Sequence, residues 1–164
     1  MLGIGIRDAG AVRIVNSTVH GNYVGIAVDS GGAVAAPLTS LTISNTLVTK
    51  NGVGVRDKTT GQHTASVVVQ SSDVWGNTVQ YENVVAGVGC IAEDPAYVAA
   101  PIDLRLTEGS PCVDVGNSSL APLTDFVGAP RPFDGDDDGE AKVRPRCVRA
   151  HECDCCRRRG RSWR

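Results

Sequence analysis

The residues best suited to chemistry in this chain are three aspartates near its C-terminal end. Asp134, Asp136 and Asp138 precede Gly139 in a D-x-D-x-D-G pattern, the first half of an EF-hand-type calcium loop. Carboxylates at alternate positions converge on one cation, and the glycine permits the tight bend. The twelfth position, where such a loop places a bidentate acid, is Pro145. The pattern predicts a calcium site with an incomplete ligand set, and an acidic surface turn is the alternative.

A second set of charged residues recurs at one position of a short repeated unit, which reads GIGIRD, GIAVDS and GVGVRD. Aligning the three units places Arg7, Asp29 and Arg56 in one column, so stacking the units brings opposite charges together. We expect a structural charge ladder. The alternative is catalytic: a glycosidase uses two carboxyl groups, and a polysaccharide lyase uses acids around a cation plus a base. The next column holds Asp8, Ser30 and Asp57.

Aromatic and histidine side chains offer weaker signals. Trp75 and Tyr81 can stack on sugar rings. For Trp75 we expect ordinary packing or surface exposure instead, because Gly-Asn follows it in a turn. His20 and His63 have no partner close by in the sequence. None of these residues predicts a catalytic site.

The elements that must position these residues are three copies of an eleven-residue phrase. The copies read VRIVNSTVHGN, LTISNTLVTKN and VVVQSSDVWGN. Apolar residues alternate within each phrase and are mostly β-branched, which favours strands. The shorter units that precede the phrases begin at Gly3, Gly25 and Gly52, at intervals of 22 and 27 residues. Such spacing is typical of a solenoid, in which each unit buries its core against its neighbours.

Asparagine and serine recur at two fixed places of the phrase. Asn16, Asn45 and Ser71 hold the first place. A sharp turn between strands needs one residue in the left-handed region, which asparagine tolerates best after glycine. Asn22, Asn51 and Asn77 hold the second place. With turns of the coil about 4.8 Å apart, we expect these side chains to line up and hydrogen-bond to one another.

These patterns predict an all-β fold, a right-handed parallel β-helix of about three to four rungs with an irregular C-terminal capping region. Four longer segments carry a resemblance to a known family: SSDVWGNTVQYENV, GVGCIAEDPAYV, DLRLTEGSPCVDVGN and DFVGAPRPFDGDDDG. In this order they resemble the C-terminal part of secreted bacterial β-helix repeat proteins of the choice-of-anchor type, which are related in fold to pectate lyases. The resemblance runs from the first residues to Lys142 or Val143.

The resemblance implies a secreted or cell-surface location and a polysaccharide or surface glycan as partner. We expect a non-catalytic structural or carbohydrate-contacting module. The alternative is the C-terminal part of a polysaccharide lyase or glycoside hydrolase, because this scaffold hosts both. No cap precedes Gly3, so we also expect the rest of a parent chain N-terminal to residue 1. The sequence has no run of 18 apolar residues, which argues against a membrane span.

We divide the chain into β-helix rungs at 1–93, a capping region at 94–143 and a tail at 144–164. The resemblance implies an acid after Val143 that would help to hold calcium, and this chain has Arg144 there. Cys90 and Cys112 are 22 residues apart, about one rung, so a disulfide between them is feasible in an exported protein.

The tail differs from the body in charge and in cysteine content. Residues 1–143 hold 8 basic and 16 acidic residues, a net charge of −8, whereas residues 144–164 hold 8 arginines and 2 acids, a net charge of +6. Such a tail can bind an acidic surface, and His151, Cys153, Cys155 and Cys156 offer a poorly spaced zinc set. Our preferred hypothesis is a frameshift near codon 143 that leaves the tail disordered. We therefore expect no nucleic-acid partner.

Overall fold

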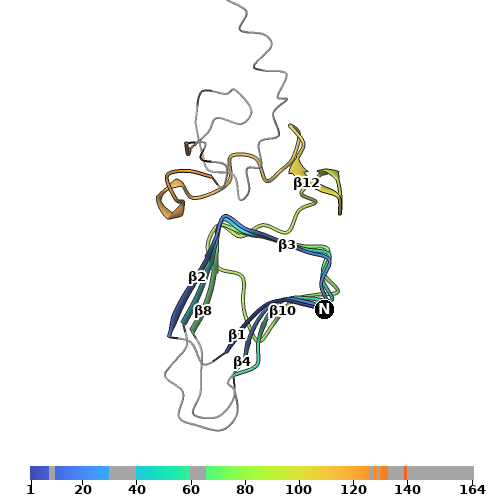
Figure 1. Ribbon diagram of the computed structural model, residues 1–164, viewed down its shortest axis with the longest axis vertical. Helices are drawn as coiled ribbons and strands as arrows, with labels where there is room; N and C mark the ends of the chain where they lie inside the picture. Colours follow the sequence, from blue (N-terminus) through green and yellow to red (C-terminus); the bar gives the residue numbers. More distant parts are fainter. Residues whose placement is uncertain are drawn as a thin grey trace, which may run out of the picture.

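The chain coils through three parallel sheets that form the sides of a triangle in cross-section (Figure 1). The computed structural model describes residues 1–7, 10–29, 40–59, 66–125, 128, 130–132 and 139. The first sheet contains β1 (Leu2–Arg7), β4 (Val24–Asp29), β7 (Val53–Asp57) and β10 (Val79–Glu82). The second contains β2 (Ala11–Val15), β5 (Ser40–Ser44) and β8 (Ser66–Gln70). The third contains β3 (Thr18–His20), β6 (Leu47–Thr49) and β9 (Asp73–Trp75).

Each turn of the chain contributes one strand to every sheet, so neighbouring strands of a sheet belong to successive rungs. All pairings within the three sheets are parallel. The structure thus confirms the prediction of an all-β repeat fold with stacked parallel strands. Among the described residues, no helix has the length and apolar character needed to span a bilayer.

The core consists of aliphatic side chains stacked on equivalent positions of successive rungs. Val19 pairs with Val48, and Val48 with Val74, and all three are buried. Similar stacks join Ile14, Ile43 and Val69 in the second sheet, and Ile26 and Val55 in the first. Burying each such side chain contributes about 1.5–3 kcal/mol. Ile14, Ile43 and Val69 are alternating apolar positions of the three phrases, so the expected inward face of the second-sheet strands is confirmed.

The corner between the second and third sheets has the predicted turn residues. Asn16, Asn45 and Ser71 all adopt left-handed backbone conformations, with φ of 49°, 50° and 47°. At the corner between the third and first sheets, the left-handed residue comes one position before the closing asparagine of the phrase. Gly21, Lys50 and Gly76 take that conformation there.

The second set of asparagines forms a hydrogen-bonded ladder, as predicted. Asn51 Oδ1 accepts hydrogen bonds from the backbone N–H of Asn22 at 2.8 Å and from its Nδ2 at 3.3 Å. Asn77 Oδ1 accepts from the backbone N–H of Asn51 at 2.8 Å and from its Nδ2 at 2.9 Å. Asn51 and Asn77 are buried, so these bonds satisfy polar groups that have little access to water.

The rungs differ in length at only one corner. Equivalent residues of the first sheet, such as Leu2, Val24, Val53 and Val79, are 22, 29 and 26 residues apart. Two residues separate the second-sheet strand from the third-sheet strand in every rung, and three separate the third-sheet strand from the next first-sheet strand. The connections from the first to the second sheet contain 3, 10 and 8 residues.

Residues that follow β10 lie across the end of the last rung. Ser71 N–H donates to Val88 O, Ile91 N–H to Ser72 O, and Val74 N–H to Ile91 O, at 2.9–3.2 Å. Val84 packs against the hydrophobic core in the same stretch. This segment, which precedes Asp94, therefore covers part of the end of the last rung. From the region after Asp94, the buried Cys112 contacts Asp73 of the same rung.

Described residues that follow Asp94 lie along the outer side of the third sheet. Here β11 (Tyr97–Ala99) and β12 (Asp103–Leu106) form an antiparallel hairpin, which lies beside β3 in Figure 1. A 3-10 turn follows at Ser118–Leu120. Asn117 exchanges two hydrogen bonds of 2.9 Å with the side chain of Asn45, which anchors this region on the middle rung.

Asp73 is the most deeply buried acid in the contact between this region and the coil, with a relative exposure of 0%. Its Oδ1 accepts from Glu93 N–H at 3.1 Å, and Oδ2 accepts from the Cys112 thiol at 3.6 Å. Burial raises the pKa of Asp73 from 3.8 to about 6, although both hydrogen bonds oppose the rise. Burial and the Asp73 charge raise the pKa of Cys112 to about 12. Cys90 and Cys112 are both free thiols in the structure, so the feasible disulfide is not formed.

We predict that Asn51→Ala costs about 2–4 kcal/mol in the free energy of unfolding, measured by urea denaturation. The change removes the acceptor of Asn22 N–H and the donor that bonds to Val19 O and Asn77 Oδ1. Asn22→Ala, at the half-buried end of the ladder, is the matched control and should cost about 1 kcal/mol. Equal losses in the two variants would contradict a ladder whose middle member carries most of the bonds.

We also predict that Asp73→Asn changes the pH dependence of stability. Because folding raises the pKa of this acid, its favourable contribution is complete below pH 4 and is lost as the pH rises through about 6. The free energy of unfolding of Asp73→Asn, relative to that of the wild type, should therefore increase by about 2–3 kcal/mol between pH 4 and pH 7. Urea denaturation at several pH values measures this difference, and a constant difference would refute the assignment.

Candidate functional site

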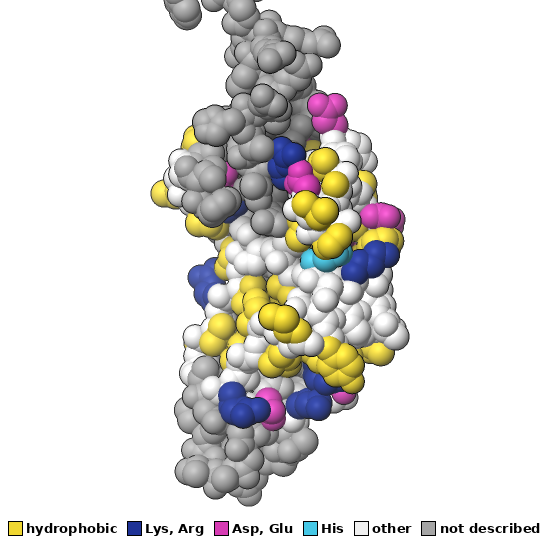
Figure 2. Space-filling model, turned by 45° about the vertical axis from the view of Figure 1, so that its right-hand side comes forward, with side chains coloured by type: hydrophobic (Ala, Val, Ile, Leu, Met, Phe, Trp, Pro, Cys, Tyr) yellow, Lys and Arg dark blue, Asp and Glu magenta, His cyan; other side chains and the backbone are white. Residues whose placement is uncertain are grey.

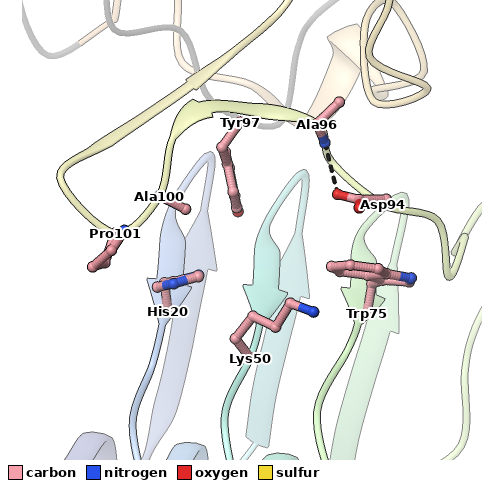
Figure 3. A pocket seen from close by; sticks show the side chains of 8 residues that line it. All are labelled: His20, Lys50, Trp75, Asp94, Ala96, Tyr97, Ala100 and Pro101. Carbon is pink, nitrogen blue, oxygen red and sulfur yellow. Dashed lines mark hydrogen bonds between the residues drawn. The ribbon is translucent and has the colours of Figure 1, made fainter.

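A groove lies between the third sheet and the β11–β12 hairpin (Figure 3). It has a volume of about 420 Å³, within the range of natural ligand sites. Its main contributors from the coil are His20, Lys50 and Trp75, one from each rung. The hairpin side contributes Asp94, Tyr97 and Pro101. We call this the hairpin groove.

Rung stacking aligns two groove residues of the coil, His20 and Trp75, with the buried Thr49 between them. His20, Thr49 and Trp75 pair with one another at the last position of β3, β6 and β9. The preceding residue of each strand is a buried valine of the core, so alternation along the strand directs this last position outward. Trp75 is half-buried, and its ring faces the groove.

Lys50 occupies a corner position that glycine holds in the two neighbouring rungs. Its φ is 55°, and the equivalent glycines of the rungs on either side, Gly21 and Gly76, have φ of 72° and 64°. A residue with a Cβ loses about 1–2 kcal/mol in this conformation. The Lys50 Nζ lies 4.0 Å from the centroid of the Trp75 ring, a cation–π contact.

Gly76 makes the room that the Lys50 side chain needs. A Cβ added at Gly76 would lie 3.1 Å from Lys50 Cδ and 3.2 Å from both Cε and Nζ. The lysine side chain therefore crosses directly above a glycine to reach the tryptophan of the next rung.

The hairpin is joined to the groove floor by a short polar chain. His20 Nδ1 and Thr49 Oγ1 are 2.9 Å apart, and Thr49 Oγ1 is 3.1 Å from the Tyr97 hydroxyl. The His20 and Tyr97 rings meet edge to face, with centroids 5.7 Å apart and an angle of 87° between their planes. These contacts hold Tyr97 over the first two rungs.

Two charged side chains of opposite sign border the groove near Trp75. Asp94 approaches the indole from the hairpin side, and its Oδ1 accepts a hydrogen bond from Ala96 N–H at 3.0 Å. Lys50 approaches from the coil side. Figure 2 shows a histidine beside basic and acidic side chains, with hydrophobic atoms of the hairpin next to them. Burial, followed by the charge of Lys50, lowers the pKa of His20, so its ring is neutral at pH 7.

The expected charge ladder on the first sheet exists only in part. Arg7 and Asp29 pair in register and form an ion pair of 3.1 Å. Arg56 instead pairs in register with Ala27 and Glu82, and its ion pair of 2.7 Å is with Glu82. The alignment of Arg56 with Asp29 was wrong by two residues.

The glycines explain this shift of two residues. A Cβ added at Gly25 would lie 2.7 Å from the Gly54 carbonyl oxygen, so these two glycines stack closely. The equivalent of Gly25 in the next rung is therefore Gly54, and the sequence alignment had used Gly52. A second hollow of about 430 Å³ lies on this sheet beside Arg7, Asp29 and Lys58.

Several predicted site residues lie outside the described residues. They include the calcium candidates Asp134, Asp136 and Asp138, the column members Asp8 and Ser30, His63, and the whole 144–164 tail. Gly139, the last residue of the calcium pattern, is described and has φ of 93°, which glycine adopts readily. Within the described ranges, no three His, Cys, Asp or Glu side chains gather as a metal-ligand set.

The two aromatic candidates from the sequence have different positions. Trp75 lines the hairpin groove, whereas Tyr81 packs against the hydrophobic core, where burial raises its pKa. Lys50, Asp94 and Tyr97 were missed. Lys50 had one detectable signal, since it replaces the glycine that precedes asparagine in the other two phrases. Tyr97 and Asp94 had none, because their contacts join segments far apart in the chain.

We predict that His20 titrates below 6.5 in the folded protein and that Lys50→Gly raises its pKa part of the way back. Burial is the larger cause of the lowered value and persists in the variant, whereas the repulsion by Lys50 is lost. Proton NMR of the imidazole resonances measures both values. A His20 pKa that does not change in Lys50→Gly would contradict an ammonium group close to the ring.

The chain matches no protein-family model, no curated protein and no solved structure.

Proposed function

We propose that this chain is a non-catalytic module of a secreted or cell-surface bacterial protein and that it contacts carbohydrate through the hairpin groove. The finer fold that we propose is a right-handed parallel β-helix related to that of pectate lyases. Three parallel sheets with one strand per rung support this assignment, as do the left-handed asparagine corners and the asparagine ladder.

One observation carries the carbohydrate proposal: Trp75 lines an open groove whose other walls present both charged and neutral polar groups. The apolar face of a sugar ring packs on an aromatic ring, and its hydroxyl groups need hydrogen-bond partners. Asp94 and Tyr97 supply such groups from the hairpin side, while Lys50 and His20 supply them from the coil. Because the floor comes from successive rungs, the groove follows the coil axis, along which an extended chain of sugars can lie.

The alternative is that this chain is the C-terminal part of a polysaccharide lyase or glycosidase with its catalytic rungs elsewhere. Two acids of the first sheet are engaged with arginines, Asp29 with Arg7 and Glu82 with Arg56. A third, Asp57, accepts two hydrogen bonds from Thr59. Asp73, whose raised pKa is of the kind found in general acids, has no exposed surface from which to reach a sugar. These observations favour the non-catalytic proposal. A calcium ion at Asp134, Asp136 and Asp138 stays a prediction.

We predict that Trp75→Ala weakens glycan binding by about tenfold or more, because the stacking surface is lost. The measurement is isothermal titration calorimetry against a panel of neutral and acidic oligosaccharides. Tyr23→Ala is the matched control, since Tyr23 is an aromatic residue with 72% exposure that does not line the groove. Circular dichroism verifies that both variants are folded.

Two results would contradict the proposal. One is the failure of every oligosaccharide in the panel to bind the wild type. The other is an equal loss of affinity in Tyr23→Ala and folded Trp75→Ala, which would show that the groove is not the binding site.

A further inference from the structure

The backbone of Lys50 is strained in a way that the fold itself does not need. The corner requires a left-handed residue, and the neighbouring rungs supply glycine at Gly21 and Gly76. Glycine adopts this conformation without a steric penalty, whereas lysine has a Cβ that opposes it. The middle rung therefore has lysine, the less stable residue for this conformation, where the rungs on both sides have glycine.

The strained corner fixes where the Lys50 ammonium group lies. From this corner the side chain passes over Gly76 and holds Nζ 4.0 Å from the centre of the Trp75 ring. A lysine on an ordinary exposed strand has several freely rotating bonds, but here the ring and the glycine limit its directions. Backbone strain of this kind clusters at binding sites, where it preorganises a functional group.

We propose that Lys50 and Trp75 form a recognition site for an acidic sugar unit, in which Lys50 binds the anionic group and the sugar ring packs on the face of the Trp75 ring that Lys50 does not cover. This inference rests on the proposed carbohydrate contact and adds the class of sugar. The anionic group is a carboxylate, as in a uronic acid, or a sulfate ester, since both offer oxygens to an ammonium donor.

The other groove residues agree with a ligand that has one acidic group and several hydroxyls. His20 is neutral and adds no second positive charge, so Lys50 is the cation contributed by the coil. Asp94, on the hairpin side of the indole, can accept a hydrogen bond from a hydroxyl group but would repel a second anion. A cationic ligand is disfavoured, because Lys50 already holds the cation–π position on Trp75.

The test compares ligands with the same skeleton and different charge. Oligomannuronate is titrated against its methyl ester, and a sulfated cello-oligosaccharide against cello-oligosaccharide, by calorimetry at low and high salt. The variants are Lys50→Gly and Lys50→Asn, which suit the left-handed corner, and Lys50→Arg, which keeps the charge. Lys58→Ala is the control, because Lys58 is an exposed lysine beside the other hollow, on the first sheet.

We expect the wild type to bind at least one acidic ligand about tenfold more tightly than its neutral counterpart. This preference should weaken with salt. Lys50→Gly and Lys50→Asn should lose the preference, while their melting temperatures equal or exceed that of the wild type because both residues suit the left-handed corner better than lysine. Lys50→Arg and Lys58→Ala should retain the preference. The acidic ligand that shows the effect identifies the group as a carboxylate or a sulfate.

The failures of the two proposals are distinguishable. If acidic and neutral ligands bind equally and Trp75→Ala weakens both, the carbohydrate contact stands and the acidic-sugar inference is wrong. If no ligand binds in a Trp75-dependent way, both are wrong. If Lys50→Gly and Lys50→Asn both unfold, Lys50 is needed for the fold and the inference is also wrong.

Discussion

The structure depends on one constraint, which is that each rung must place its backbone and its inward side chains directly on those of the rung before it. Parallel strands about 4.8 Å apart can form their hydrogen bonds only if equivalent positions stay in register. In this chain the asparagine ladder and the stacks of similar aliphatic side chains fix the register within the core. A buried asparagine with no partner above and below would be a large penalty, so the ladder also opposes any slip of one rung against the next.

The hairpin groove is a by-product of the same stacking. Because His20, Thr49 and Trp75 share one register position, three different chemical groups appear in a row on the outside of the third sheet. The C-terminal region is tied to the same side by Asn117 at one end and Tyr97 at the other, and it converts an open sheet face into a groove. The coil aligns the side chains of one wall along its axis, and the hairpin forms the second wall. The lysine at a glycine-type corner is the clearest departure from the regular pattern.

Much of the coil could be predicted from the sequence, because its determinants are local and repeat. The strands follow from alternating β-branched residues, and the first corner from asparagine and serine that the structure places at positive φ. The register of Arg56 could have been predicted but was missed. Gly25 follows Asn22 by three residues and Gly54 follows Asn51 by three residues, so counting from the closing asparagines aligns Gly25 with Gly54 and not with Gly52. The groove could not be predicted. Its walls are joined by contacts such as Thr49 with Tyr97 and Asn45 with Asn117, which link residues 48 and 72 positions apart.

The unequal rung lengths have a consequence for how such a chain tolerates change. Two corners contain two and three residues in every rung, whereas the connections between the first and second sheets contain 3, 10 and 8. A residue gained or lost at a fixed corner would disturb the left-handed turn and the hydrogen bonds of the asparagine beside it. Extra residues between the first and second sheets leave the stacked positions untouched, because the chain re-enters the second sheet in the same register. The coil therefore has one edge along which insertions, grafted loops or whole domains can be added while the groove on the opposite side keeps its geometry.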